Sequence, residues 1–453
     1  MAKKKETLSP KERLQVALVP EGEQPYPVPG NWCWTRMENI AQWGSGGTPS
    51  RKIPEYYNGD IPWIKTGELN DDYIFETEEH ITEEAISHSS AKLFPVNTVA
   101  IAMYGATIGK VGILGVTATT NQACACGVSN PSTNYKYLFY YARSQRDNFI
   151  KKGKGGAQPN ISQEIIKSHE FPFPPLSEQQ RIVDRIESLF AKLDEAKQKA
   201  QDALDSFETR KAAILHKAFT GELTAQWRIE HGVGMESWDY PRFEDCILKM
   251  QNGLAKRSGS SGTSFVVLRL ANLSDNGFVT DDLREILLDE KEQKNYSLKD
   301  NDVLMIRVNG SKDNVGKQFL FYGKLKWAFC DHIIRITYKT NLSPEYMVYF
   351  SKTNTYRRYI EDNMVSSAGQ NTISRKGMAS LLIPIPLMDE QSEIVCLLDD
   401  LLAKEQQAKE AAEGVLEQID LIKKAILARA FRGELGTNDP SEESAVELLS
   451  SKI

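Results

Sequence analysis

Two glycine-rich segments contain residue types that could bind a phosphate group. Residues 105–111, Gly-Ala-Thr-Ile-Gly-Lys-Val, resemble a phosphate-binding loop, but such a loop has four residues between its glycines and Ser or Thr after the lysine. Here three residues separate the glycines, and Val111 follows Lys110. Residues 44–50, Gly-Ser-Gly-Gly-Thr-Pro-Ser, contain no lysine. We therefore predict that neither segment binds a nucleotide.

The rest of the sequence lacks the residue combinations that enzymes use. It contains no Gly-x-Gly-x-x-Gly fingerprint of a dinucleotide site. Residues 130–133, Asn-Pro-Ser-Thr, break the Asn/Asp-Pro-Pro-Tyr/Phe signature of adenine methyltransferases. The six histidines are scattered, and the six cysteines do not have the spacing of zinc ligands. We predict no catalytic residue, metal site or cofactor in this chain, and a buried strand for the close pair Cys124 and Cys126.

Basic, aromatic and hydroxyl residues occur in loop-like stretches of both halves of the chain. Arg and Asn can bond two atoms of one base in the DNA major groove, whereas Lys and hydroxyl groups mostly contact phosphates. Each residue alone is most simply a solvated surface residue, but the set recurs at similar places in the two halves. The candidates in the first half are Thr48, Ser50, Arg51, Lys65, Tyr104, Thr107, Lys110, Lys151 and Lys154. The candidates in the second half are Lys256, Arg257, Arg269, Arg307, Asn309, Lys312, Lys317 and Arg375.

The two halves are copies of one unit. Lys211–Leu223 and Lys423–Leu435 are identical at 9 of 13 positions, 212 residues apart. At the same offset, Glu178-Gln179 matches Glu390-Gln391. Earlier in each half the match is weaker and the offset falls to 204. Each copy therefore consists of a variable portion followed by a well-matched portion.

The well-matched portions have the apolar spacing of long helices. Apolar or small residues recur in steps of three and four over about five heptads, in the same register in both copies. About 42 residues would form a helix of roughly 60 Å. We expect the two helices to pack against each other, with Arg210 and Glu405 as interruptions of the apolar seam. The packing residues that we predict are Ile182, Ile186, Leu189, Leu193, Phe207, Ile214, Ile394, Leu398, Leu401, Val415, Ile419 and Ile426.

The variable portions contain short β-type runs, turn clusters and aromatic-rich helices, which indicate mixed α/β (α+β) domains. We therefore expect two such domains joined by two long antiparallel coiled-coil helices, with a pseudo-twofold internal repeat. The expected boundaries are 1–30 for an N-terminal arm, 31–176 for the first domain, 177–221 for the first spacer helix, 222–237 for a linker, 238–388 for the second domain, 389–433 for the second spacer helix and 434–453 for a C-terminal tail.

Length and charge agree with this organisation. A chain of 453 residues is too long for one ordinary core. The net charge of −6 comes mainly from 390–431 and from the tail, while the rest is close to neutral. The basic start lacks the apolar stretch of a signal peptide, and no apolar run could span a bilayer. We expect a cytoplasmic protein.

The sequence resembles the specificity subunits of Type I restriction-modification systems over nearly its whole length. The resemblance is carried by residues 174–183, Pro-Pro-Leu-Ser-Glu-Gln-Gln-Arg-Ile-Val, and by Ala-Phe-Thr-Gly-Glu-Leu at 218–223. Residues 385–391 and 430–435 repeat both motifs. Gly-Gly-Thr-Pro-Ser and Tyr-Gly-Ala-Thr-Ile-Gly-Lys, which end at Ser50 and Lys110, are typical of the recognition domains of this family.

The resemblance implies a non-catalytic, sequence-specific DNA-binding subunit. Each target-recognition domain would read one half of a bipartite site in double-stranded DNA, while the helices set the gap and dock two methyltransferase (M) subunits. Restriction (R) subunits would join the same complex. S-adenosylmethionine for DNA methylation, and ATP with Mg, would be bound by these partners. Asn309-Gly-Ser replaces the Gly-Ala-Thr-Ile-Gly stretch in the second copy, so the base read there does not follow from the family.

Two other functions are compatible with the sequence. A DNA-modifying enzyme, either an adenine methyltransferase or a nuclease with an unrecognised site, would act on DNA without partners. A coiled-coil scaffold would bind only proteins, although it would not need the large loop-rich domains.

We expect Lys110 and Arg307 to lie in corresponding loops that face DNA.

Overall fold

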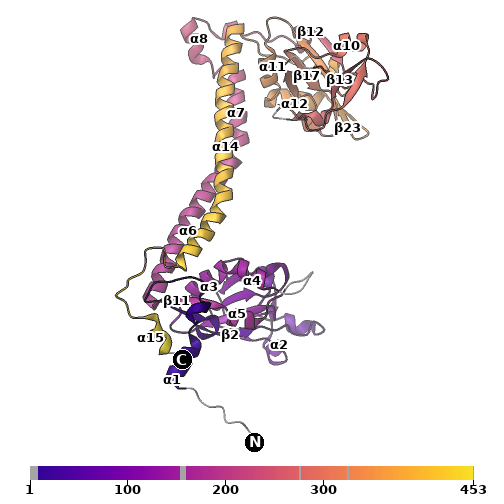
Figure 1. Ribbon diagram of the computed structural model, residues 1–453. Helices are drawn as coiled ribbons and strands as arrows, with labels where there is room; N and C mark the ends of the chain where they lie inside the picture. Colours follow the sequence, from indigo (N-terminus) through magenta and orange to yellow (C-terminus); the bar gives the residue numbers. More distant parts are fainter. Residues whose placement is uncertain (1–8, 154–159, 275–276, 324–325, 452–453) are drawn as a thin grey trace. The chain divides into compact units, whose positions relative to one another are not determined.

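The chain forms two compact units. The computed structural model describes residues 9–153, 160–274, 277–323 and 326–451. Unit 1 consists of Met1–Lys199 and Gly414–Ile453, and unit 2 consists of Ala200–Glu413. Each unit therefore contains one variable portion together with segments of both long helices (Figure 1).

Unit 1 is built on two main sheets. The five-stranded sheet has the order β2 (Ala41–Ser45), β10 (Cys124–Ser129), β7 (Val99–Ala102), β8 (Val111–Leu114), β4 (Tyr73–Ile74). The four-stranded sheet has the order β5 (His80–Ile81), β3 (Ile61–Ile64), β9 (Ala118–Thr120), β6 (Leu93–Phe94). The pair β1 (Cys33–Arg36) and β11 (Glu170–Phe173) lies beside α3 (Tyr135–Ser144), and α3 also contacts β7 and β8. Burial raises the pKa of the Cys126 thiol to about 12, and the prediction of a buried strand at Cys124 and Cys126 is confirmed.

Unit 2 repeats this strand order. Its four-stranded sheet has the order β12 (Ile247–Asn252), β21 (Ile333–Tyr338), β17 (Asp302–Ile306), β19 (Gln318–Phe321). A second sheet has the order β16 (Glu285–Leu288), β13 (Thr263–Leu268), β20 (Trp327–Phe329). The pair β13–β20 is parallel, as is the pair β3–β9 in unit 1, although most neighbouring strands are antiparallel. The shared order and the shared parallel pair show that the internal repeat extends through the variable portions.

The strand register locates the difference between the two copies. Ile101 pairs with Val111 in unit 1, and Met305 pairs with Gln318 at the equivalent place in unit 2. The offset between copies is therefore 204 residues before the connecting loop and 207 residues after it. The loop is three residues longer in unit 2, which agrees with the departure seen in the sequence.

The long helices occur where the apolar spacing predicts them. The second is α14 (Met388–Ala430), and the first is divided into α6 (Leu176–Asp205) and α7 (Phe207–Phe219). At the division, the Ser206 hydroxyl donates to the Asp202 carbonyl at 2.8 Å, a local bond by which serine competes with helix bonding. The amide of Arg210 still donates to the Ser206 carbonyl at 3.0 Å, so the interruption is slight.

The helices pair in an antiparallel manner within each unit. In unit 1, Lys423 forms an ion pair with Asp194, and its ammonium group lies 5.1 Å from the centroid of the Phe190 ring. In unit 2, Arg210 and Glu405 form an ion pair at 2.8 Å. The two charged residues that interrupt the apolar seam therefore compensate each other.

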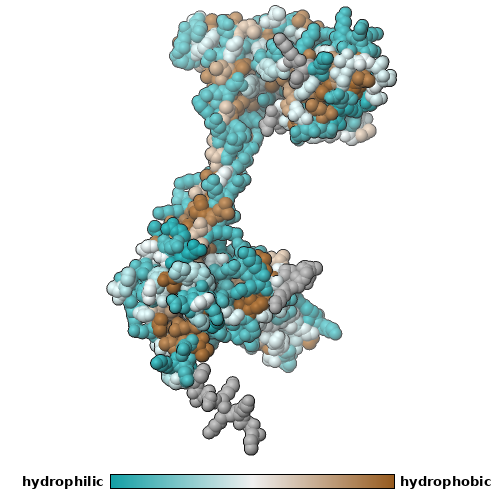
Figure 2. Space-filling view, viewed as in Figure 1, coloured by the Kyte–Doolittle hydropathy of each residue, from teal (hydrophilic) through white to brown (hydrophobic). Residues whose placement is uncertain are grey.

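The predicted packing residues differ in how far they are buried. Ile182, Ile186, Phe207, Ile394, Leu398 and Ile419 are buried, and Leu189, Leu193, Ile214, Leu401 and Ile426 are partly buried. Val415 is 41% exposed, while Ala412 and Ile419 on either side of it are buried. Leu421 and Ile422 of α14 are also exposed. Hydrophobic patches interrupt the mostly hydrophilic surface of the helices in Figure 2. A straight helix drifts from a strict seven-residue repeat, which explains why one seam position can face solvent.

The first turn of each long helix buries a Glu-Gln pair. Gln179 and Gln391 are fully buried, and their amide groups donate to the carbonyls of Pro174 and Pro386 at 3.0 and 2.9 Å. These bonds tie the proline-rich segment that precedes each helix to its first turn. The repeated glutamines are therefore structural residues.

In unit 1 the buried Glu178 is bound by the C-terminal tail. Thr437 donates to Glu178 at 2.8 Å, and Arg181 bonds both Glu178 and Glu442 at 2.6 and 2.8 Å. Helix α15 (Ala445–Ser450) adds two buried apolar residues to the core of the unit. The tail is thus an integral part of unit 1.

The equivalent Glu390 of unit 2 is bound by the segment that follows α7. Its carboxylate accepts hydrogen bonds from Thr224, Arg228 and Trp238 at 2.7, 2.6 and 3.1 Å. Each long helix therefore begins against the segment that follows the other long helix.

Within the described residues, no helix is both long enough and apolar enough to cross a membrane.

Candidate nucleic-acid interface

One loop in each unit is shaped by a glycine in the left-handed region. Gly109 has φ +73° and Gly316 has φ +83°, and their amides donate to the carbonyls of Ala102 and Ile306 at 3.0 and 2.8 Å. These bonds close the loops 103–110 and 307–317. A side chain at either glycine would be strained, since L residues rarely adopt this conformation.

The helices of each unit hold these loops in place. The Arg146 guanidinium donates to the Gly109 carbonyl at 3.1 Å and forms an ion pair with Asp71. In unit 2, the Tyr356 hydroxyl donates to the Gly316 carbonyl at 2.8 Å. The same carbonyl position is therefore fixed in both copies, by different side chains.

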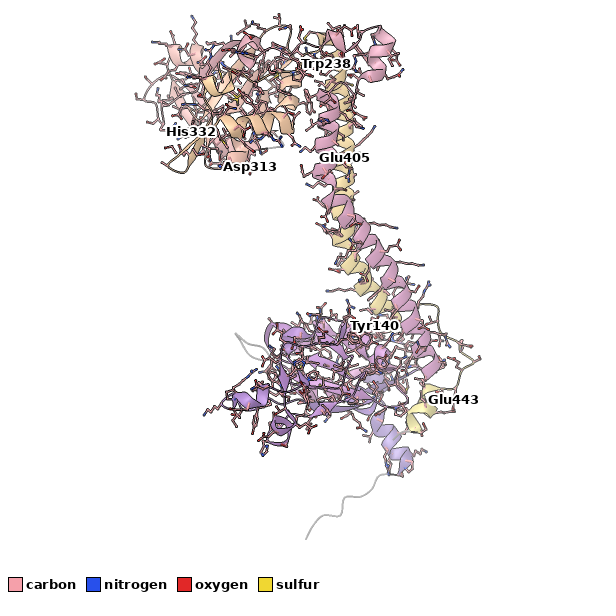
Figure 3. The ribbon with its side chains drawn as sticks, turned by 180° about the vertical axis from the view of Figure 1, so that it is seen from behind. Tyr140, Trp238, Asp313, His332, Glu405 and Glu443 are labelled. Atoms are coloured by element: carbon pink, nitrogen blue, oxygen red, sulfur yellow. The ribbon has the colours of Figure 1, made fainter. Side chains whose placement is uncertain are left out.

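Two further loops meet each of these loops at the same end of the sheets. The amides of Met103 and Arg307 donate to the carbonyls of Ala123 and His332, each at 2.8 Å. The segments after β2 and β12 join them, because Gly47 bonds Thr120 and Leu254 bonds Phe329. We call these clusters the three-loop surfaces, made of 46–51, 103–110 and 121–123 in unit 1 and of 253–258, 307–317 and 330–332 in unit 2. His332 and Asp313 lie at one edge of unit 2 in Figure 3.

Several of the predicted basic residues are neutralised within the chain. The Arg51 guanidinium lies 4.1 Å from the centroid of the Tyr57 ring and bonds Glu79 at 2.5 Å. Lys65 bonds the same Glu79 at 3.0 Å, and the hydrogen bond from Arg51 is the largest cause that lowers the pKa of this carboxyl. This network fixes the loop that presents Thr48 and Ser50, both of which are exposed.

Predicted basic residues of unit 2 are also paired with acidic residues of the same unit. Lys256 bonds Glu292 at 2.8 Å, and Arg269 bonds Asp282 at 2.7 Å. Arg257 bonds both carboxylate oxygens of Asp331, at 2.9 and 3.3 Å. These acidic partners are 13 to 74 residues away in sequence, so spacing along the chain does not indicate them.

Other predicted residues keep their charge or their polar group available. Lys110, Lys151, Arg307, Lys312 and Arg375 have no ion pair or side-chain hydrogen bond with another described residue. Tyr104 is 45% exposed. Thr107 donates to the Tyr104 carbonyl, Asn309 accepts from the Ser311 amide, and Lys317 lies at the end of its loop. Lys154 lies outside the described residues.

Lys110 and Arg307 belong to corresponding loops but occupy different positions in them. Lys110 corresponds to Lys317. The carbonyl of Lys110 accepts from the amide of Ala102 at the end of β7, and the carbonyl of Lys317 accepts from the amide of Ile306 at the end of β17. Arg307 corresponds to the buried Met103, because the amide of Met103 donates to the residue before β10 and the amide of Arg307 donates to the residue before β21.

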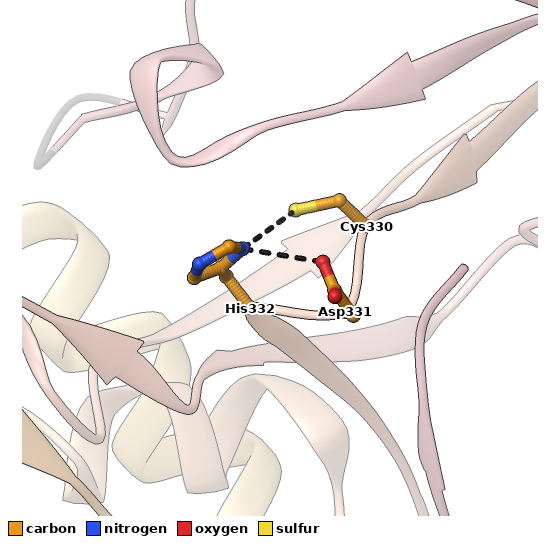
Figure 4. Close-up of side chains that lie close together, drawn as sticks. All are labelled: Cys330, Asp331 and His332. Carbon is orange, nitrogen blue, oxygen red and sulfur yellow. Dashed lines mark hydrogen bonds and ion pairs between the residues drawn. The ribbon is translucent and has the colours of Figure 1, made fainter. Parts of the chain in front are cut away.

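One cluster in unit 2 has the composition of a metal site. One donor atom each of Cys330, Asp331 and His332 lie within 4.8 Å of one another (Figure 4). The Arg257 guanidinium occupies both oxygens of Asp331, and burial raises the pKa of the Cys330 thiol. A neighbouring positive charge and a protonated thiol both disfavour a cation. We interpret the cluster as part of a polar network on the three-loop surface.

Comparison with known proteins identifies the class of protein. The profile of the Type I restriction modification DNA specificity domain matches residues 29–204 and 271–414. The Type I restriction enzyme StySPI specificity subunit of Salmonella potsdam is 28% identical over 437 residues, which cover 94% of this chain and 93% of the relative. The EcoKI specificity subunit of Escherichia coli (strain K12) is 25% identical over 422 residues, with 90% of each chain covered. The HsdS subunit from Thermoanaerobacter tengcongensis has a similar fold, with a TM-score of 0.65 and 19% identity over 91% of this chain and 99% of that chain.

The chain therefore belongs to the family of Type I restriction-modification DNA specificity subunits. It is a specificity subunit, the non-catalytic member of a Type I restriction-modification enzyme. The predicted family, mixed α/β fold and DNA-specificity function are confirmed.

Proposed function

We propose that each three-loop surface reads one half of a bipartite DNA site, and that the paired helices set the gap between the two halves. The main support is the repetition: the same sheet, the same parallel strand pair and the same three loops occur once in each unit. Two copies of one reading device on one chain suit a site with two separate halves. Lys110, Arg307 and Lys312, which form no ion pair with another described residue, supply cations for phosphates and base edges in these loops.

We further propose that two methyltransferase subunits dock on the long helices, with restriction subunits completing the complex in the cytoplasm. The exposed Val415, Leu421 and Ile422 of α14 provide apolar area for such a contact. S-adenosylmethionine would be bound by the methyltransferase subunits, and ATP with Mg by the restriction subunits. A net charge of −6 is compatible with DNA binding if these partners supply part of the phosphate neutralisation.

Charge reversal tests the assignment of the loops. The chain is co-expressed with its methyltransferase subunit, and the modified motif is determined by sequencing methylated adenines in cellular DNA. Lys110→Glu should relax or abolish recognition of one half-site and Arg307→Glu that of the other, with assembly of the complex unchanged. Lys299→Glu, at an exposed position outside the three-loop surface, is the matched control. Equal loss at both half-sites, or no change in either, would contradict the proposal.

A further inference from the structure

Gln122 and Asp331 occupy the same position in the two copies. Gln122 precedes Ala123, whose carbonyl accepts from the amide of Met103 at the start of loop 103–110. Asp331 precedes His332, whose carbonyl accepts from the amide of Arg307 at the start of loop 307–317. Gln122 lies in a tight turn after β9, and Asp331 lies in a tight turn after β20. These strands are the second members of the parallel pairs β3–β9 and β13–β20. The sequence comparison misses this equivalence, since the residue types differ.

Both residues make the same connection across the three-loop surface. Gln122 accepts a hydrogen bond from the Thr48 hydroxyl through Oε1, and Asp331 accepts two from Arg257. Thr48 and Arg257 both lie in the loop that follows the edge strand, β2 or β12. In each unit the contact therefore joins this loop to the turn beside the 103–110 or 307–317 loop.

The exposed groups at these two places are suited to bases. Gln122 is exposed, and its Nε2 makes no hydrogen bond with a described residue, so the amide can still offer a donor beside its bonded oxygen. A glutamine amide can bond N6 and N7 of adenine together. The Arg257 side chain is 50% exposed, and its two-point bond to Asp331 holds the guanidinium plane in one orientation. Such a guanidinium can bond O6 and N7 of guanine.

We infer that Gln122 contacts an adenine in one half-site and that Arg257 contacts a guanine in the other, with Asp331 as the positioning residue for Arg257. This inference rests on the proposed function, because it needs one half-site for each unit. It assigns a specificity-determining role to a pair of equivalent positions that carry different chemistry, and so explains how two copies of one fold read different sequences.

Methylome sequencing of variants co-expressed with the methyltransferase subunit tests the inference. Gln122→Ala and Arg257→Ala should each reduce discrimination at a single base pair by roughly 5- to 150-fold, in different half-sites. Asp331→Asn leaves Arg257 in place but removes the charge that orients it. It should weaken discrimination at the Arg257 base pair while non-cognate DNA is bound as well as before or better. Asp331→Glu should restore part of the discrimination, which a merely structural role would not predict.

Matched controls separate a local effect from a change of charge or fold. Asp281→Asn removes one exposed carboxylate outside the three-loop surface, and Gln42→Ala removes an exposed amide from β2. Both controls should keep the wild-type motif. If thermal unfolding shows that Gln122→Ala is not folded, the isosteric variant Gln122→Glu tests the inference instead. This variant should lose the preference for adenine.

The outcomes distinguish this inference from the proposed function. An unchanged motif in the Gln122 or Arg257 variants, or a change in the half-site assigned to the other unit, would overturn the inference. A wild-type chain whose motif has no two separate halves would instead overturn the proposed function.

Discussion

At the residue scale, glycines in the left-handed region shape the two loops, and Gly109 and Gly316 are the ones packed against a helix. A Cβ atom on Gly316 would lie 2.9 Å from Ile360, and one on Gly109 would lie 3.0 Å from the Cα of Arg146. Gly105 also has positive φ, +64°, but no atom of the described residues lies within 4 Å of its Cβ position. The three positions therefore separate backbone strain from steric contact.

Gly316→Ala and Gly109→Ala should each lower the free energy of unfolding by about 2 kcal/mol, because they add a clash to the strain of a left-handed alanine. Gly105→Ala should cost only about 1 kcal/mol, since it adds strain alone. Urea unfolding of the purified chain measures the difference. Equal costs at Gly105 and Gly109 would show that contact with the helix does not matter.

His169 makes unit 1 sensitive to acid. Burial, and then the charge of Lys152, lower the pKa of His169 to about 4. The neutral ring accepts from Lys152 through Nδ1 at 3.0 Å and donates through Nε2 to Gln145 at 3.2 Å. Glu170 opposes the shift with an oxygen 3.6 Å from Nδ1. The folded unit therefore favours the neutral imidazole.

The stabilisation from His169 should be complete above pH 6.5 and decrease as the pH falls toward 4, because only the unfolded chain takes up the proton in that range. Its full size is about 3 kcal/mol. Hydrogen exchange in the β1–β11 pair from pH 7 to 4.5, compared between wild type and His169→Gln, measures this change. Identical pH dependence of the two proteins would show that another group is responsible.

Twelve of the seventeen predicted residues lie on the three-loop surfaces, whereas Lys65, Lys151, Arg269 and Arg375 lie elsewhere and Lys154 is outside the described residues. The sequence did not indicate which of the twelve are already paired. Arg51 and Arg257 look like free cations in the sequence, yet Glu79 and Asp331 neutralise them across the fold. Such pairs depend on the path of the chain between strands, which local spacing does not encode. Gln122, which we propose as a base contact, was not among the predicted residues, because a single exposed glutamine carries no pattern in the sequence.

At the element scale, the long helices followed closely from the sequence because a repeated apolar seam constrains every turn. Helix α14 begins and ends within a few residues of the expected range 389–433. The division at Ser206 was not predicted, because one hydrogen bond from a hydroxyl leaves no trace in the apolar pattern. The order of the strands could not be predicted either, since short β-type runs do not specify their neighbours.

The length of the helix pair should set the gap between half-sites. Deleting 193–199 from α6 and 417–423 from α14 removes one heptad from each helix, together with both members of the pair Asp194 and Lys423. Each helix loses about 10 Å. Methylome sequencing should show a shorter gap and unchanged bases in both half-sites.

The control is the double variant Asp194→Ala with Lys423→Ala, which breaks the ion pair but keeps the helix length. It should retain the wild-type gap. If the gap is also unchanged in the heptad deletion, the helices do not measure the distance between half-sites.

At the scale of the whole molecule, the C-terminal tail stabilises the beginning of the chain's first long helix. A chain that ends at Gly436 loses the bond of Thr437 to Glu178, the bonds of Glu442 to Arg181 and the buried residues of α15. The start of α6 should become less stable by about 3 kcal/mol. Hydrogen exchange should therefore speed up there by about 100-fold.

The start of α14 is the internal control for this truncation, because Glu390 is bound by residues that remain. Its exchange rates should not change. Equal acceleration at both helix starts, or at neither, would show that the tail is not specific to unit 1.

The discontinuity of unit 1 also has a consequence for synthesis on the ribosome. Unit 2 is one uninterrupted segment, Ala200–Glu413, whereas unit 1 needs both Met1–Lys199 and Gly414–Ile453. Unit 1 must wait until residues 414–453 have left the exit tunnel, while unit 2 can fold before they do. Nascent chains should thus acquire their second reading surface earlier than their first, in the reverse of the usual N-to-C order of domain folding.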